Sequence, residues 1–413
     1  MFLYNTSIII FGFAIRVVSL FSTKAKLWLS GRRGQFNKLK ADVKKDGKVV
    51  WFHCASLGEF EQGRPLLELF KQKYPQYKIL LTFFSPSGYE NKKNYSGADY
   101  VYYLPLDTFK NAKEFIDIVQ PDIVYFVKYE YWFNYLSILK KREIPVYLIS
   151  AIFRENQLFF KRYGKSYRRV LHLFKHIFVQ DDKSKILLKS IGVTNTSVSG
   201  DTRFDRVAEI ASQAKDAVVI KNFISNSFVL VAGSTWQPDE VLLHKYINEK
   251  ELNIKLILAP HEVDIVNIER IGKLFGNKLI KYSQVKDIIS EEKNVLLIDN
   301  IGLLSTLYKY ATITYVGGGF KTGLHNVLEP AAYGKPIIFG PNYSRFREAI
   351  GLIKAKAGYS ISNYSEFENV LDLLISNMET YKMSSKNSVS YINDNCGATN
   401  LILEESAPDA YLD

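Results

Sequence analysis

The segment CASLGEF at residues 54–60 places a serine, a glycine and a carboxylate directly after an apolar run that is typical of a strand. Ser56, Gly58 and Glu59 are expected on the turn into a following helix, where the glycine would let a ligand approach the backbone closely. A carboxylate at a helix start is often only a cap that the helix dipole favours. The residues alone leave a capping role and a role toward a ligand open.

Two further polar turns follow apolar runs in the first half of the chain. FFSPSGYE at 83–90 carries Ser87, and VKYEYWFN at 127–134 carries Glu130 between aromatic residues. A carboxylate among aromatic rings is either a packed, hydrogen-bonded structural group or a group that faces a sugar. The spacing does not decide between the two.

The second half contains residues suited to binding a phosphate. In residues 315–341 three glycines end an apolar run and precede a polar loop and the helical pattern NVLEPAAYG. Backbone N–H groups of such a loop and helix start favour an anion, and Glu329 could accept hydrogen bonds from ribose hydroxyls. Ser234 and Thr235 follow another apolar run, and APHE at 259–262 follows a third. The dinucleotide fingerprint GxGxxG does not fit here; this set is typical of two-domain nucleotide-sugar transferases of the GT-B type.

Near-continuous apolar runs separated by helical patterns predict parallel sheets that are covered on both faces. Ligands of such sheets bind beyond the carboxyl ends of the strands, where the polar clusters fall. We therefore predict an α/β protein of two doubly wound domains that face across a cleft: a membrane-associating segment at 1–48, an acceptor-binding domain at 49–210 and a donor-binding domain at 211–413, whose last helix would pack back on the first domain. The runs are 49–56, 78–84, 122–127, 146–152 and 176–181 in the first domain, and 228–234, 254–260, 295–299, 313–319 and 335–341 in the second.

The chain has 413 residues, a formal charge of +12 and two cysteines, which indicates an anionic partner and a reducing compartment. Residues 2–21 are apolar apart from Arg16, and six Lys or Arg residues follow within 24–40. Such a cluster binds anionic headgroups and places the rest of the chain on the cytoplasmic side. A buried core helix is the alternative, and spanning or lying on the membrane stays open because the run is barely long enough.

Taken in order, these motifs resemble bacterial Kdo (3-deoxy-D-manno-octulosonic acid) transferases along nearly the whole chain, with elements of the Bacteroidetes-type variant. The resemblance rests on S-x-G-E at 56–59, PSGYE at 86–90, YEYWFN at 129–134, SGDTRFDRV at 199–207 and GLHNVLEPAAYGKPIIFGP at 323–341. It implies a GT-B glycosyltransferase that moves Kdo from CMP-Kdo to a lipid A precursor at the cytoplasmic side of the inner membrane, without a metal or other cofactor. Consistent with that, the sequence has no Asp-x-Asp element.

The resemblance also implies residue roles. Glu59 would be the proton acceptor in an inverting displacement, and the leaving charge would meet helix N-termini near 319–326. The positions that would hold cytidine monophosphate are Pro260, His261, Ile301, Gly302, Leu303, Asn326, Val327, Leu328 and Glu329. Three positions depart from the family pattern. His261 follows Pro260 directly, where the family more often has an arginine between the proline and the histidine; Leu303 stands where relatives often have a glutamate; and Lys128 stands where many relatives have an acid.

Further candidates extend these two sets. For the donor phosphate they are Arg203, Ser234, Thr235, Gly318 and Gly319; for the acceptor they are Ser56, Gly58, Ser87, Glu130, Arg154, Arg168 and Arg169. The three acceptor arginines belong to the basic and aromatic stretch 153–176, which could equally be a solvated basic helix.

Three other classes of protein are alternatives. Another GT-B transferase or a sugar epimerase would share the fold and the Glu329 region, but would not explain the N-terminal segment together with Ser56–Glu59. A nucleic-acid-binding protein would explain the charge, yet no such motif is present. A membrane scaffold without catalysis would explain only residues 1–48.

Overall fold

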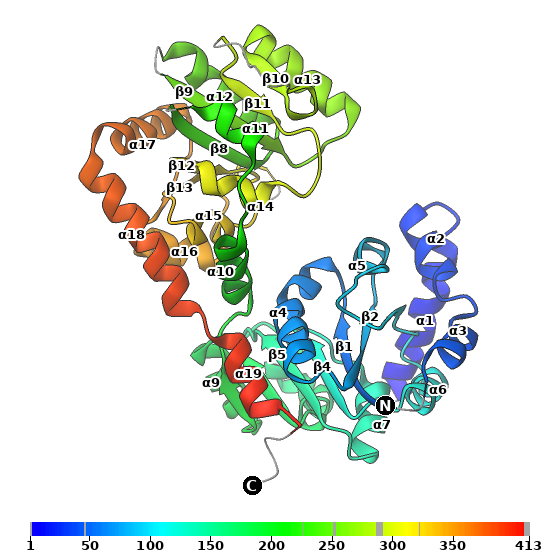
Figure 1. The fold of residues 1–413 in the computed structure, drawn as a ribbon. Coiled ribbons are helices and arrows are strands. Elements are labelled where there is room, and N and C mark those ends of the chain that lie inside the picture. Colours follow the sequence, from blue (N-terminus) through cyan, green and yellow to red (C-terminus); the bar gives the residue numbers. More distant parts are fainter. Residues whose placement is uncertain are drawn as a thin grey trace. The chain divides into compact units, whose positions relative to one another are not determined.

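The computed structural model describes residues 2–44, 47–225, 227–250, 253–285, 292–321 and 323–408. The chain divides into two compact units. Unit 1 consists of Met1–Arg206 and Cys396–Asp413, and unit 2 of Val207–Asn395. Each unit is a parallel sheet with helices on both faces, which confirms the predicted α/β class with two doubly wound sheets (Figure 1).

Unit 1 contains a seven-stranded parallel sheet in the order β3-β2-β1-β4-β5-β6-β7. Its strands are β1 (Lys48–Cys54), β2 (Tyr77–Phe83), β3 (Tyr100–Tyr103), β4 (Ile123–Val127), β5 (Val146–Ala151), β6 (His176–Val179) and β7 (Thr196–Val198). The helices are α1 (Phe2–Val18), α2 (Thr23–Ser30), α3 (Gln35–Asp42), α4 (Leu57–Lys73), α5 (Pro86–Lys92), α6 (Phe109–Val119), α7 (Phe133–Lys141), α8 (Lys165–Arg168), α9 (Asp182–Ser190) and α19 (Ala398–Ser406), with short 3-10 turns at η1 (Leu158–Phe160), η2 (Arg162–Gly164) and η3 (Leu171–Leu173).

The apolar strands of unit 1 are explained by a core on each face of the sheet. Along β1, Val49 and Trp51 pack into one cluster, whereas Val50 and Phe52 pack into the other. Successive side chains of a strand point to opposite faces, so a strand covered on both sides needs apolar residues at every position. This burial places the polar turn at Ser56–Glu59 at the carboxyl end of the central strand β1.

Unit 2 repeats the architecture with the order β10-β11-β9-β8-β12-β13-β14. Its strands are β8 (Phe228–Thr235), β9 (Ile254–Pro260), β10 (Leu279–Lys281), β11 (Val295–Leu297), β12 (Ile313–Val316), β13 (Ile337–Phe339) and β14 (Gly358–Ser360). The helices are α10 (Arg203–Gln213), which begins in unit 1, α11 (Val218–Ile224), α12 (Gln237–Glu249), α13 (Ile265–Phe275), α14 (Leu304–Leu307), α15 (Leu328–Ala332), α16 (Arg347–Lys354), α17 (Tyr364–Ser376) and α18 (Met378–Asn395), with 3-10 turns at η4 (Gly276–Lys278), η5 (Tyr282–Gln284) and η6 (Tyr308–Tyr310).

The end of β8 carries an irregularity that shapes the region after it. The register of β8 against β9 shifts between Gly233 and Thr235, and Ser234 between them has a φ of 54°. A non-glycine residue with positive φ is uncommon, and such strained positions cluster at functional sites. Gly317, after β12, lies so close that a Cβ there would approach the Ser234 carbonyl oxygen to 2.4 Å. The first glycine of the triplet is therefore required by packing against this bulge.

Helix α1 is fastened to unit 1 by polar contacts near its start. The hydroxyl of Tyr4 donates to Asp107, and Asn134 donates to the side chain of Asn5 at 2.9 Å. Beyond these contacts α1 and the turn after it expose Ile9, Ile10, Phe13, Val17, Val18, Leu20 and Phe21. In the described part of the chain, none of the helices combines the length and the apolar character that crossing a membrane requires.

Arg32, one of the basic residues predicted to bind lipid headgroups, makes hydrogen bonds within unit 1. The Arg32 guanidinium donates to the carbonyls of Trp28, Phe84 and Leu104 at distances of 3.0, 2.7 and 2.9 Å. These three bonds join α2 to the loops after β2 and β3. Arg32 is thus a structural residue, and the expectation that it belongs to the exposed basic cluster was wrong.

Helix α19 returns the end of the chain to unit 1, where it packs beside α4 (Figure 1). Its N-cap is Gly397, which has no side chain to offer. Asp205 replaces that cap by accepting from the Gly397 N–H at 2.6 Å, the Thr399 N–H at 2.8 Å and the Thr399 hydroxyl at 2.6 Å. Ile402 and Leu403 are buried in the same cluster as Phe52. Asp205 of the SGDTRFDRV motif therefore completes unit 1.

Candidate functional site

Glu59 occupies the first turn of α4, three residues after the N-cap Ser56. The spacing S-x-x-E is that of a capping box, in which both side chains would bond to backbone N–H groups. Here the Ser56 side chain makes no cap bond and instead donates its hydroxyl to the Glu59 carboxylate. Glu59 is partly exposed at the carboxyl end of β1. This geometry differs from a simple cap, because the carboxylate is held by a neutral donor and remains reachable.

Charged and aromatic neighbours surround this carboxylate. Burial raises the pKa of the Tyr129 phenol, while the charge of Arg154 lowers it and that of Glu59 raises it. Burial, and next the charge of Glu59, raise the pKa of the Cys54 thiol well above its usual range. Arg154 is exposed. Glu59, Tyr129 and Arg154 thus lie near one another at this edge of the unit 1 sheet, and Cys54 is an inert buried thiol rather than a nucleophile.

Glu130 lies in a packed polar cluster. It is 6% exposed, accepts from the Trp132 indole N–H at 2.5 Å, and lies 2.9 Å from Nε2 of the fully buried His53. The other ring nitrogen of His53 lies 2.9 Å from the Thr82 hydroxyl. Of the two readings that the sequence left open, this geometry favours the structural one. Ser87, in the first turn of α5, pairs its hydroxyl with that of Ser85 at 3.0 Å.

The basic stretch 153–176 is not a continuous helix. It folds into the short turns η1, η2, α8 and η3. The Arg168 guanidinium donates to the Phe159 carbonyl at 2.7 Å and the Lys161 carbonyl at 3.3 Å, so it holds these turns together. Arg168 is therefore better described as a structural residue than as an acceptor-binding one, whereas Arg169 is exposed. Arg203, a candidate for the donor phosphate, donates to Asp201 at 2.7 Å within unit 1.

Unit 2 contains a pocket of about 320 Å³ beyond the carboxyl ends of β8, β9 and β12. Five residues named by the sequence line it together, although they come from separate segments. They are Ser234, His261, Gly302, Asn326 and Glu329. Four residues that sequence reasoning missed complete the lining: Leu304, Ser305, Tyr308 and His325.

The remaining residues predicted to bind the donor do not line this pocket. The side chains of Val327 and Leu328 are fully buried, so only their backbone could meet a ligand. Ile301 is 85% exposed. Pro260 is the last residue of β9, and Leu303 is the N-cap of α14. None of these five residues is among those that line the pocket.

Three of the residues predicted to bind the donor phosphate make hydrogen bonds or close packing contacts within unit 2. The Thr235 hydroxyl is buried and donates to Glu240 at 3.2 Å. The Gly318 N–H donates to the Asp239 carboxylate at 3.1 Å. Gly319 lies against the backbone of Gly340, where a Cβ would meet atoms at 2.7 Å. These glycines therefore serve close packing in this structure, and their role toward a phosphate stays a prediction.

The helix expected at NVLEPAAYG is only the five residues of α15. Its first N–H, that of Leu328, donates to the Asn326 side chain at 3.0 Å, and the Asn326 amide donates to Glu329 at 3.0 Å. A single short turn offers little dipole to a leaving group. The expectation that helix N-termini near 319–326 carry this charge was wrong, because most of that segment is an irregular loop.

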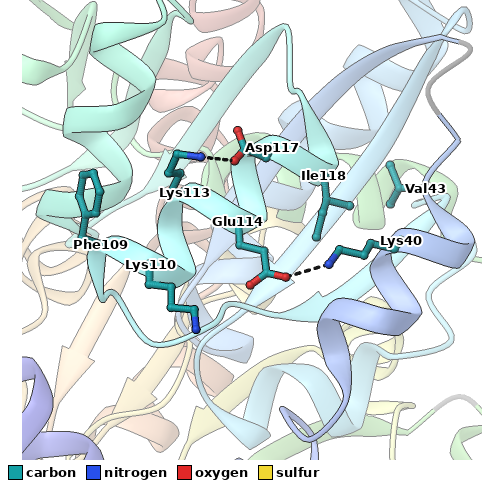
Figure 2. A pocket seen from close by; sticks show the side chains of 8 residues that line it. All are labelled: Lys40, Val43, Phe109, Lys110, Lys113, Glu114, Asp117 and Ile118. Atoms are coloured by element: carbon teal, nitrogen blue, oxygen red, sulfur yellow. Dashed lines mark hydrogen bonds and ion pairs between the residues drawn. The ribbon is translucent and has the colours of Figure 1, made fainter.

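A second hollow of the described surface lies away from these strand ends. It measures about 720 Å³ between α3 and α6 and is lined by Lys40, Val43, Phe109, Lys110, Lys113, Glu114, Asp117 and Ile118 (Figure 2). Figure 2 shows that Lys40 pairs with Glu114 and Lys113 with Asp117, each at 2.9 Å. These pairs neutralise most of its charge, which is typical of a solvated helix surface. Among the described residues, no group of three or more His, Cys, Asp or Glu side chains could hold a metal ion; the prediction of a metal-free reaction stays a prediction.

Comparison with known proteins bears on both units. Residues 29–206 match the family described as "3-Deoxy-D-manno-octulosonic-acid transferase (kdotransferase)". The chain is 29% identical to the 3-deoxy-D-manno-octulosonic acid transferase of Aquifex aeolicus over 354 residues, which cover 84% of this chain and 92% of the relative. It is 28% identical to that of Chlamydia trachomatis serovar D, covering 87% and 83%, and 26% identical to that of Haemophilus influenzae, covering 87% and 86%.

Two UDP-GlcNAc 2-epimerases are among the solved structures with a similar fold. The UDP-GlcNAc 2-epimerase of Neisseria meningitidis superposes with a TM-score of 0.61 at 19% identity, covering 86% of this chain and 98% of that one. The enzyme of Methanocaldococcus jannaschii gives a TM-score of 0.54 at 14% identity, covering 84% and 99%. At such low identity these matches establish the GT-B-like fold alone. The sequence comparisons add that the chain is similar to bacterial Kdo transferases over most of its length, with residues 29–206 matching the model of that family.

Proposed function

We propose that this chain transfers Kdo from CMP-Kdo to a lipid A precursor, lipid IVA, in lipopolysaccharide core biosynthesis. The observation that carries the proposal is the pocket of unit 2, where five residues predicted from separate motifs line one space. The relatives named above are Kdo transferases. A pocket of about 320 Å³ falls at the lower end of the sizes that small ligands occupy, roughly 300–1,000 Å³.

The polar residues of this pocket suit a nucleotide. The Glu329 carboxylate accepts from the ribose hydroxyls, as expected for an acidic group at the edge of a nucleotide site. The exposed side chains of His261 and Asn326 supply hydrogen bonds. Ser234, whose backbone has a positive φ, lines the same pocket. No cofactor or metal takes part, because cytidine monophosphate is already an activated leaving group.

Glu59 is the base in this proposal. The lipid hydroxyl attacks the anomeric carbon of Kdo, its proton passes to the Glu59 carboxylate, and the bond from that carbon to the phosphate oxygen breaks. The electron pair of that bond leaves with cytidine monophosphate, and attack from the opposite side inverts the configuration. A positioned general base contributes about 10²–10⁴-fold to such a step. The Ser56 hydroxyl orients the carboxylate without neutralising it.

The N-terminal segment suits the cytoplasmic surface of the inner membrane. The exposed apolar residues of α1 supply area for burial between lipid headgroups, and Lys24, Lys26, Arg33 and Lys38 are exposed close by in the sequence. Each basic residue near an anionic surface contributes about 1 kcal/mol. We propose that α1 lies on the membrane and brings unit 1 to its lipid acceptor.

The test is an assay of CMP release with purified protein, CMP-Kdo and tetraacylated lipid A precursor, with the acceptor mass followed in parallel. Glu59→Gln should lower the turnover number about 10²–10⁴-fold. Glu61→Gln, on the same helix, is the matched control and should retain near wild-type activity. Wild-type protein that releases no CMP in an acceptor-dependent way would contradict the reaction. Full activity of Glu59→Gln would contradict only the role of the base.

A further inference from the structure

Three aromatic rings beside the unit 2 pocket form a stack of pairwise contacts, and of the three only His261 has a part in the proposed reaction. Trp236 follows β8, His261 follows β9, and His325 lies in the loop between β12 and α15. The ring centroids of Trp236 and His261 are 4.7 Å apart, and those of His261 and His325 are 4.4 Å apart, with 26° between the planes in both pairs. The His261 ring thus contacts both of the other rings.

A hydrogen bond between Trp236 and His325 determines which ring nitrogen of His325 carries the proton. The Trp236 indole Nε1 lies 3.1 Å from Nε2 of His325. An indole N–H can only donate, so Nε2 of His325 must accept. A neutral imidazole has one N–H, which then has to be on Nδ1.

The surroundings keep His325 neutral. Burial, and next the charge of His261, lower the pKa of this imidazole to about 4. At neutral pH the ring therefore presents a single N–H donor and cannot transfer a full proton as an acid.

The free N–H points away from the glycine loop. Gly318 has a φ of +89°, and a Cβ at this position would lie 2.8 Å from Cδ2 and 3.1 Å from Nε2 of His325. The Cδ2–Nε2 edge of the ring therefore faces Gly318. Nδ1 is the ring atom opposite that edge, and within the described residues it has no hydrogen-bond partner, although His325 lines the pocket. A donor without an acceptor beside a pocket is suited to an incoming ligand.

We propose that His325, held by Trp236 in the tautomer with its proton on Nδ1, donates a hydrogen bond to an anionic oxygen of the bound donor. The oxygen belongs either to the phosphate or to the sugar carboxylate. This inference rests on the proposed function for the identity of the donor. In the reaction, His325 would stabilise charge by hydrogen bonding, and Trp236 would be a positioning residue that acts through it.

The tautomer is tested first, in full-length protein labelled with ¹⁵N in its six histidines. Long-range ¹⁵N–¹H correlation spectra at neutral pH should show the His325 proton on Nδ1. Trp236→Phe keeps a ring in the stack but removes the donor, so a mixture of tautomers should appear. A proton on Nε2 in the wild type would overturn the inference. Titration with inorganic phosphate should move the Nδ1 signal of His325.

Binding is tested by calorimetry with cytidine, CMP and CMP-Kdo. His325→Phe should weaken CMP binding about 10- to 100-fold and leave cytidine unchanged, because a hydrogen bond to a charged group is lost. His325→Asn should restore most of the affinity, since its amide nitrogen stands near the place of Nδ1, whereas His325→Gln should not. A loss confined to CMP-Kdo would assign the contact to the carboxylate.

The outcomes separate this inference from the proposed function. Equal affinities of wild type and His325→Phe for all three ligands would overturn the role of His325 while leaving the reaction intact. Wild-type protein that binds none of the three but shifts the His325 signal with phosphate would refute the CMP-Kdo assignment and retain the anion contact. No shift with phosphate and no binding would overturn both. Thermal melts of each variant verify that it is folded.

Discussion

Asp205→Ala should loosen the end of the chain from unit 1. Asp205 accepts three hydrogen bonds from Gly397 and Thr399, and α19 has no other N-cap side chain. Loss of an N-cap side chain costs about 0.5–2 kcal/mol. The three short bonds place this site at the upper limit, while the partial exposure of Asp205 argues against a larger value. We expect a cost of about 2 kcal/mol.

This cost should appear as local opening of α19 and its contacts with α4. About 2 kcal/mol corresponds to a roughly 30-fold larger population of the open state. Amide hydrogen exchange of the peptide that contains residues 398–406 should accelerate by that factor, while exchange in unit 2 stays unchanged. Glu404→Ala, an exposed change on the same helix, is the control. If Asp205→Ala and Glu404→Ala exchange at the same rate, the capping role is refuted.

Three other predictions follow from the contacts described above. Burial raises the pKa of Asp107 to about 6, so the folded state holds this proton more tightly than the unfolded chain. The contribution of the protonated carboxyl to the free energy of unfolding is therefore greatest below about pH 4 and is lost as the pH rises through 6. In denaturant titrations at several pH values, Asp107→Asn should lack this pH dependence of stability. Arg168→Ala should lower the free energy of unfolding by about 1 kcal/mol, whereas Arg169→Ala should leave it unchanged and raise the KM for the lipid acceptor several-fold; equal melting temperatures of the two variants would count against the structural role of Arg168. Gly317→Ala should cost about 1–3 kcal/mol because its Cβ would collide with Ser234, and calorimetry should also show weaker CMP binding.

The sequence predicted the central strands better than the edge strands. β1, β4, β8 and β9 are apolar at most positions because both faces of the sheet are covered, and such runs are conspicuous. The edge strands β3, β7, β10 and β14 have only three or four residues and are partly exposed, so their sequences resemble loops. The 3-10 turns of 158–173 likewise had no periodic signal.

Residues of the candidate site that lie at strand ends could be predicted from the sequence. Residues that reach the site only through tertiary contacts were missed. His261 directly follows the apolar run 254–260, whereas Asn326 was expected from the resemblance to Kdo transferases. Tyr308 has the pattern of a core residue and is indeed buried, yet it lines the same pocket. The local sequence gave no sign that Arg168 would bind carbonyls seven and nine residues away, or that Asp205 would cap a helix 192 residues later.

The two separate stretches of chain that build unit 1 set an order for its biosynthesis. Residues 1–206 leave the ribosome first, and all of residues 207–395 must be made before 396–406 can follow. Until then the surface that α19 covers beside α4 stays open, and a nascent chain exposes the apolar positions that Ile402 and Leu403 later shield. Premature stop codons near the 3′ end of the gene would therefore damage the first unit to be translated, although every residue of its sheet had been made.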